Sequence, residues 1–212
     1  IRNANDAISL SQTAEGAIGK LTEMAQRMRE LAVQSANATN DDATDRVNLD
    51  AEYQQLALEI TRTISSTSFN GKFILAGDAG ALDFQVGANN GDTVTITTTD
   101  MSGDADVTAV TGGNVTTVTD SNTAMDNIDT LLNTLASERA TYGAAQNRFD
   151  AIIGVLQVSS ENQAAARGRI MDADFAAETA NLSRAQILQQ AGNAMVAQAN
   201  QLPQQVLQLL QR

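Results

Sequence analysis

Apolar and small side chains recur every 3.5 residues toward both ends of the chain, and this repeat restricts the fold more than any other feature. From Ile18 to Ser35 the repeat advances in alternating steps of three and four residues. The members of the C-terminal seam are Leu188, Ala191, Met195, Ala199, Leu202 and Val206. A period of 3.5 is the spacing of a left-handed coiled coil, in which a partner helix covers one face. The sequence therefore predicts long, paired helices.

Polar runs divide this helical pattern into four helices. A polar stretch at residues 37–45 separates the first helix, expected at about 3–36, from a second at about 44–65, so the two form a helical hairpin. The helical period returns at Ser121 and predicts a helix over about 122–166, with Arg139 and Gln146 as polar interruptions of its seam. Gly168 and the capping residues 172–174 mark a joint before the last helix. Pro203 is expected to kink that helix or to end it.

Between the second and third helices the apolar residues follow a period of two, which is typical of strands. Residues 72–75, 82–86 and 93–98 are strand candidates, and the polar turn at 89–92 contains the Asn-Gly pair that favours a hairpin. Two weaker strands are predicted near 107–110 and 115–118, where Val and Thr are frequent.

Together these patterns predict a mainly α fold with a small β region, an elongated helical rod or coiled-coil bundle that carries β-hairpins. Aromatic residues make up only 3% of the chain, so burial must rely on Leu, Ile, Val, Met and Ala, as in helix-on-helix seams. The predicted parts are a helical hairpin at 1–68, a β-hairpin region at 69–120, a long helix at 121–168 and a C-terminal coiled-coil segment at 169–212.

The residue types that carry most enzyme chemistry are missing. The chain has no His and no Cys, which excludes the common general base, the thiolate nucleophile and the usual transition-metal sites. Lys20 and Lys72 lie in neither an SxxK nor a P-loop context. The Asp clusters lack the spacing of a calcium-binding EF-hand loop. We therefore predict no catalytic residue, no metal site, no cofactor and no enzymatic activity.

Charge and hydropathy exclude two further classes of partner. The net charge is −12, whereas a protein that follows nucleic-acid phosphates needs a basic face. No apolar run approaches the roughly eighteen residues that a membrane-spanning helix needs. We therefore predict neither nucleic-acid binding nor membrane insertion.

Several motifs resemble those of bacterial flagellins and stand in the same order as in that family. The most recognisable is QRMRELAVQSAN at residues 26–37. The others are LDAE at 49–52, SFNG at 68–71, FQVGAN at 84–89, RATYGAAQNR at 139–148, RIMDADFA at 169–176 and QIL at 186–188. The resemblance covers roughly residues 1–98 and 121–212. The family's variable outer region is reduced to about 99–120, and about fifty residues of its N-terminal helix are expected to have been removed.

The resemblance implies a structural subunit of the bacterial flagellar filament, which serves motility. Such subunits assemble with identical copies through coiled-coil terminal helices, so residues 169–212 would belong to the filament core. The implied partners are a flagellar export chaperone, a cap protein and further copies of the chain. The implied location is the extracellular filament, reached by export without a cleaved signal peptide.

The resemblance also implies a recognition patch. Arg27, Leu31 and Glu52 match positions through which flagellins are recognised by the flagellin-sensing Toll-like receptor of a host, and the same surface makes filament contacts. Residues four apart share a helix face, so an exposed patch of all three is expected. The alternative is that Arg27 pairs with Glu52 inside one chain while Leu31 packs in the bundle.

Three other functions compete with the filament subunit. The first is a flagellin-like cell-surface adhesin or receptor for a polysaccharide or host ligand, although the acidic charge and scarce aromatic residues disfavour glycan binding. The second is a hook–filament junction protein, which shares the terminal helices. An enzyme is the third and most remote.

Overall fold

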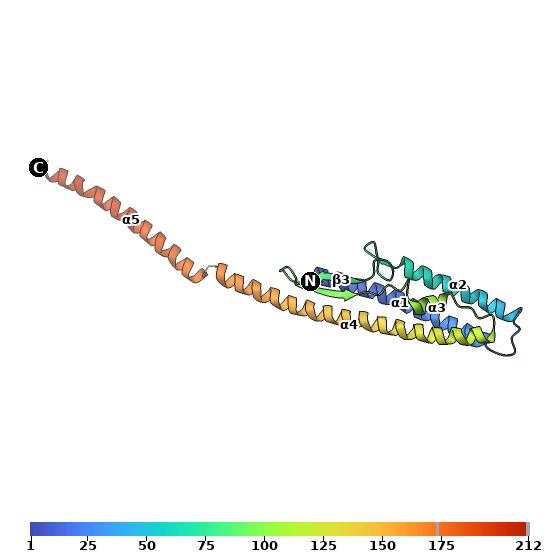
Figure 1. The fold of residues 1–212 in the computed structure, drawn as a ribbon. Coiled ribbons are helices and arrows are strands. Elements are labelled where there is room, and N and C mark those ends of the chain that lie inside the picture. The colour runs from blue at the N-terminus through green and yellow to red at the C-terminus, as the bar shows by residue number, and fades with distance from the viewer. Residues whose placement is uncertain (173, 211–212) are drawn as a thin grey trace. The chain divides into compact units, whose positions relative to one another are not determined.

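A computed structural model describes the backbone of residues 1–172 and 174–210 and the side chains up to residue 200, except that of residue 173. The chain divides into two compact units, Ile1–Val158 and Ser159–Arg212 (Figure 1). The first unit contains α1 (Arg2–Ser35), α2 (Asp45–Ser66), α3 (Ala105–Thr111) and four short strands. Helix α4 (Val118–Met171) begins in the first unit and ends in the second, which also contains α5 (Phe175–Leu210). The predicted fold class, mainly α with a small β region, is confirmed.

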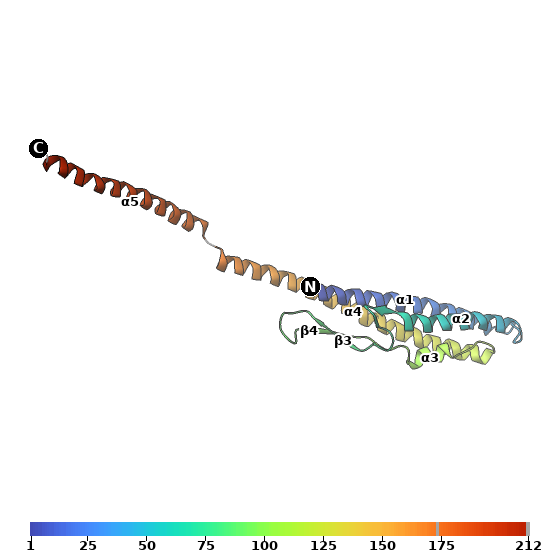
Figure 2. The ribbon, with the colours of Figure 1, turned by 90° about the horizontal axis from the view of Figure 1, so that it is seen from above.

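Three helices of the first unit lie side by side, α1 with α2 and with the first part of α4 (Figures 1 and 2). The buried face of α1 follows the predicted repeat. Its buried residues are Ala4, Ala7, Leu10, Ser11, Ala14, Ile18, Leu21, Ala25, Met28, Leu31, Ala32 and Ser35. Five of them are alanines, whose small side chains allow neighbouring helix backbones to approach closely. The core therefore consists of narrow seams between helices.

Two antiparallel hairpins follow α2. Strands β1 (Ser68–Phe69) and β2 (Lys72–Phe73) are joined by Asn70 and Gly71, whose φ angles of 50° and 80° suit the tightest hairpin turn. Strands β3 (Ala81–Gln85) and β4 (Thr93–Thr97) pair with Phe84 opposite Val94. The ring of Phe84 meets that of Phe149 on α4 edge-on, with centroids 5.7 Å apart. This contact fixes the second hairpin against the helices.

The two weaker strands predicted at 107–110 and 115–118 are wrong. Residues Ala105–Thr111 form α3, because Asp104 caps its N-terminus by accepting hydrogen bonds from the backbone N–H groups of Asp106 and Val107. Val107 and Val110, three residues apart, are both buried, which is helical and not strand spacing. Val115 is buried in a segment that pairs with no strand, and α4 already begins at Val118. Burial and a cap thus outweigh the β propensity of Val and Thr.

Smaller differences occur at the ends of elements. The strand predicted at 72–75 stops at Phe73, and Ile74 and Leu75 are instead buried in the turn that follows. Asp174 caps α5 by accepting from the N–H groups of Ala176 and Ala177. Residue 173, part of the predicted joint, lies outside the described residues. Helix α5 continues past Pro203 to Leu210, so this proline does not end the helix.

Candidate functional site

The antiparallel arrangement of α1 and α2 brings Arg27 and Glu52 together. The Nε atom of Arg27 donates to Oε1 of Glu52 at 2.8 Å, and Nη1 donates to Oε2 of Glu30 at 3.0 Å. The side chains of Arg27 and Glu52 are 49% and 46% exposed. The hydrogen bond to Glu52, followed by that to Glu30, raises the pKa of Arg27 above its ordinary value. The pair therefore presents a fixed, charged group to the solvent.

Leu31 does not join this exposed pair, and the expectation of one exposed patch of three residues is wrong in this respect. Its side chain is fully buried. A step of four residues rotates a helix position by about 40°, which moves the side chain from the exposed edge at Arg27 onto the buried face. The structure instead agrees with the alternative, in which Arg27 pairs with Glu52 inside one chain while Leu31 packs in the bundle.

Two further ionic contacts join α1 to α4. The Nε and Nη2 atoms of Arg29 donate to the two carboxylate oxygens of Asp129, at 2.6 and 3.1 Å. These hydrogen bonds lower the pKa of Asp129. Farther along α1, Glu15 accepts from Nε2 of Gln146 at 2.9 Å and from Nη2 of Arg139 at 3.5 Å. Arg139 and Gln146, which interrupt the apolar seam of α4, therefore both bind the same acidic residue of α1.

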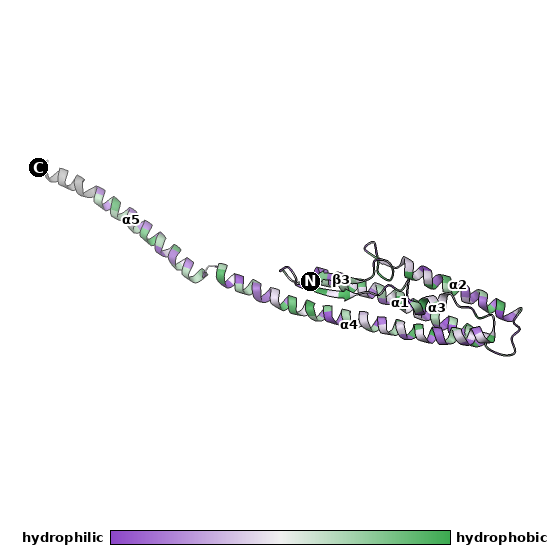
Figure 3. Cartoon of the chain, viewed as in Figure 1, coloured by the Kyte–Doolittle hydropathy of each residue, from purple (hydrophilic) through white to green (hydrophobic). Residues whose placement is uncertain are grey.

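The C-terminal seam is exposed in the second unit. Leu188 and Met195 are 65% and 72% exposed, and Ala191 and Ala199 are exposed as well. Leu202 and Val206 fall among the residues whose side chains are not described. Figure 3 shows apolar residues distributed along α5 among polar ones. No described side chain after Phe149 is buried, so the described part of this helical face is uncovered within its own unit.

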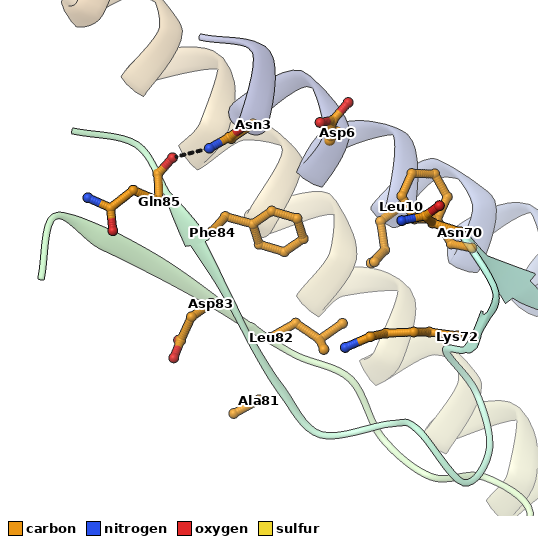
Figure 4. Close-up of a pocket in the computed structure, with 11 residues that line it drawn as sticks. Asn3, Asp6, Leu10, Asn70, Lys72, Ala81, Leu82, Asp83, Phe84 and Gln85 are labelled. Carbon is orange, nitrogen blue, oxygen red and sulfur yellow. Dashed lines mark hydrogen bonds between the residues drawn. The ribbon is translucent and has the colours of Figure 1, made fainter. Parts of the chain in front are cut away.

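An open groove of about 910 Å³ lies between the start of α1, the β1–β2 turn and β3 (Figure 4). Leu10, Leu82 and Phe84 supply apolar surface, and Lys72 lies at one side. The Nδ2 atom of Asn3 donates to the carbonyl of Gln85 at 2.8 Å and links α1 to β3 at the other end. The lining contains no nucleophile paired with a base, so it carries no recognisable catalytic arrangement.

Two other classes of site are absent from the described residues. They contain no group of three or more metal-ligating side chains. None of their helices combines the length and hydropathy needed to cross a bilayer.

Comparison with known proteins points to one family. The family model for the bacterial flagellin N-terminal helical region matches residues 1–79, and that for the C-terminal helical region matches 125–210. A flagellin of Halalkalibacterium halodurans is 44% identical over 99% of this chain and 76% of its own length. A flagellin of Bacillus subtilis is 38% identical over 99% of this chain and 79% of its own length.

Solved structures agree with these relatives. The crystal structure of Bacillus cereus flagellin is 35% identical, with a TM-score of 0.64 over 78% of this chain and 94% of that chain. A putative flagellar hook-associated protein from Vibrio parahaemolyticus reaches the same TM-score over 79% of this chain and 88% of that chain, but at 15% identity. The latter shares the fold, whereas the flagellins also share the sequence.

Proposed function

The chain belongs to the bacterial flagellins and is a structural subunit of the flagellar filament, and we propose that two of its surfaces carry its contacts. These are the α5 seam, for assembly with identical subunits, and the Arg27–Glu52 pair above Leu31, for recognition. The observation that carries the proposal is the contrast between the two units. The first unit buries its repeat, whereas the second leaves the described part of its own repeat, Leu188 to Ala199, exposed.

The α5 seam suits assembly because its apolar positions share one face, and those whose side chains are described are exposed in the second unit. Burial of apolar surface contributes about 25 cal/mol for each Å² removed from water, and a helix of another copy can supply that cover. In the complete protein, Leu188→Asp with Met195→Asp should abolish filaments seen by electron microscopy. The matched control is Gln190→Asp, which places the charge on the opposite face of the same helix. Normal filaments from the double variant would contradict the assignment of the seam.

The Arg27–Glu52 pair suits recognition because it is exposed and held in one geometry, whereas Leu31 supports it from below. We propose that the flagellin-sensing Toll-like receptor engages this pair and that neighbouring subunits cover it in the filament. Arg27→Ala should weaken receptor signalling about tenfold, the effect of losing one good contact. The unfolding midpoint should hardly change, because exposed ion pairs contribute little to stability. Normal signalling from a folded Arg27→Ala variant would remove the pair from the interface.

The subunit lies in a filament outside the cell, and it must be exported to reach that filament. We propose that an export chaperone covers the apolar face of α5 before assembly, that a cap protein guides insertion, and that no signal peptide is cleaved. Mass spectrometry of subunits from native filaments checks the last point. A mass lacking an N-terminal leader would contradict it.

The family is one of structural proteins, in keeping with the filament role. No described feature favours an adhesin.

A further inference from the structure

A charged side chain that the two proposed surfaces do not use lies at the start of α2, beside the connection to α1. Arg46 lies in the first turn of α2, and only 5% of its side chain is exposed. A guanidinium group has five N–H donors, and burying it is costly unless those donors find acceptors. Its partners therefore explain why an arginine is placed there.

Arg46 donates to three backbone carbonyls at the end of α1 and in the loop that follows. Its Nε atom donates to the carbonyl of Ser35 at 2.8 Å, Nη2 to that of Asn37 at 2.9 Å, and Nη1 to that of Asn40 at 2.7 Å. Nη1 also contacts the carboxylate of Asp42. The last carbonyls of a helix have no partner within it, and a cation there also matches the helix dipole. One side chain of α2 thus binds the end of α1 and the loop together.

The same point is connected to the start of α4. The Oγ atom of Ser35 donates to the carbonyl of Val115 at 2.5 Å, and the Oγ atom of Ser121 donates to the same carbonyl at 3.4 Å. Both serines are fully buried. The end of α1 and the beginnings of α2 and α4 therefore meet in one hydrogen-bonded cluster.

We propose that Arg46 is a positioning residue that sets the axial register of α2 on α1 and so holds Glu52 beside Arg27. Glu52 follows Arg46 by six residues and Arg27 precedes Ser35 by eight, all within regular helix. At about 1.5 Å per residue these segments transmit the geometry of the loop rigidly over roughly 10 Å. The relevance to recognition rests on the function proposed above, whereas the positioning itself does not.

The helices near the pair pack through large and small side chains, and Met28, Leu31 and Tyr53 are fully buried there. Ala25, Ala32 and Ala57 are also buried there, and at these three positions the short side chains contribute little to fixing the axial register. The connecting residues 36–44 contain no strand or helix that would fix a register. A planar guanidinium that reaches three separate carbonyls supplies that restraint, whereas the compact ammonium of a lysine cannot reach all three.

The register can be measured directly because the chain has no cysteine. Spin labels on cysteines introduced at Gln12 of α1 and Gln55 of α2, both exposed, report the axial distance between the helices in the full chain. Arg46→Met should at least double the width of the distance distribution or move its mean by up to one helical turn, about 5 Å. Ile64→Ala is the control, since it weakens the core at the other end of α2 and should leave the distance unchanged.

Arg46→Lys keeps the positive charge but not the planar guanidinium, and it should also broaden the distribution of spin-label distances. It decides the question if the methionine variant fails to fold. A distribution that matches the wild type in the folded variants would overturn the positioning role.

Receptor signalling separates this inference from the proposed recognition role. With the register disturbed, signalling should fall about tenfold, as for loss of one good contact. A disturbed distance with normal signalling would sustain the positioning role of Arg46 and withdraw recognition from the Arg27–Glu52 pair. An undisturbed distance overturns the positioning role whatever the signalling shows.

Discussion

Truncation of Leu31 gives the sharpest test of the separation between packing and recognition on α1. Leu31 is fully buried, so Leu31→Ala removes three buried carbon atoms from the seam. At about 0.8 kcal/mol for each lost CH₂ group the transfer cost is roughly 2.4 kcal/mol. A cavity that cannot collapse adds to this, and large-to-small changes of this kind cost about 2–5 kcal/mol. We therefore expect the free energy of unfolding of the first unit to fall by about 2–5 kcal/mol.

The chain provides its own probe for this measurement. It has two tyrosines and no tryptophan, and both Tyr53 and Tyr142 are buried in the first unit. Tyrosine emission during urea unfolding therefore reports that unit without a contribution from α5. Val33→Ala is the matched control on the same helix, because Val33 is 49% exposed and its truncation should change stability by no more than about 0.5 kcal/mol. Equal, small effects of the two changes would refute the burial of Leu31.

Three further predictions follow from other buried or capping groups. Burial, followed by the nearby charge of Asp50, raises the pKa of Tyr53 to about 12, so the folded state holds its proton more tightly than the unfolded state. The contribution of this group to the free energy of unfolding should therefore be fully present below about pH 10 and be lost toward pH 12. Urea titrations followed by circular dichroism would show this as a falling unfolding midpoint. A midpoint that stays constant over that pH range would contradict it. Tyr53→Phe should lower the free energy of unfolding by about 1 kcal/mol, because the Tyr53 hydroxyl donates to the carbonyl of Val110 at 3.0 Å. Tyr142→Phe should be neutral or stabilising, since the buried Tyr142 hydroxyl has no hydrogen-bond partner among the described residues. Equal losses of stability in the two variants would disprove the distinction. Asp104→Ala should cost about 1 kcal/mol by removing the cap of α3, and Asp104→Asn, which keeps an acceptor oxygen, should restore most of it in the same urea assay.

The sequence was sufficient to predict the long helices, because many positions of a long repeat indicate the same buried face. In α1 each buried position is supported by others three or four residues away, so no single residue decides the assignment. The second hairpin was predictable for a similar reason, since its strands alternate and its turn contains Asn90-Gly91, with a φ of 91° at the glycine. Helix α3 was not predictable, because seven residues rich in Val and Thr have no repeat to show, and their helix depends on a cap and on burial.

The residues of the two proposed surfaces were predictable only in part. The separation of four residues between Arg27 and Leu31 shows that they are neighbours, but not where the buried face ends. That boundary depends on which side of α1 is covered by α2 and α4. It leaves Arg27 half exposed and Leu31 fully buried, although the two are neighbours on the helix surface. Arg46 gave no signal in the sequence, because an arginine after a run of polar residues is normally a solvated charge. Its burial follows from the closure of the loop over it.

The sequence by itself determined the helical class, the flagellin family and the face of each helix that requires a partner, because spacing along a helix fixes direction around its axis. The tertiary structure decided which of those faces finds its partner within the chain. In the first unit α2 and α4 cover the repeat of α1, so that repeat becomes a core, whereas no described segment covers the same kind of repeat on α5. The physical reason is that apolar periodicity specifies that a surface must be buried but not by which molecule. Only the arrangement of the helices in space separates a seam that stabilises the subunit from one that no described segment covers.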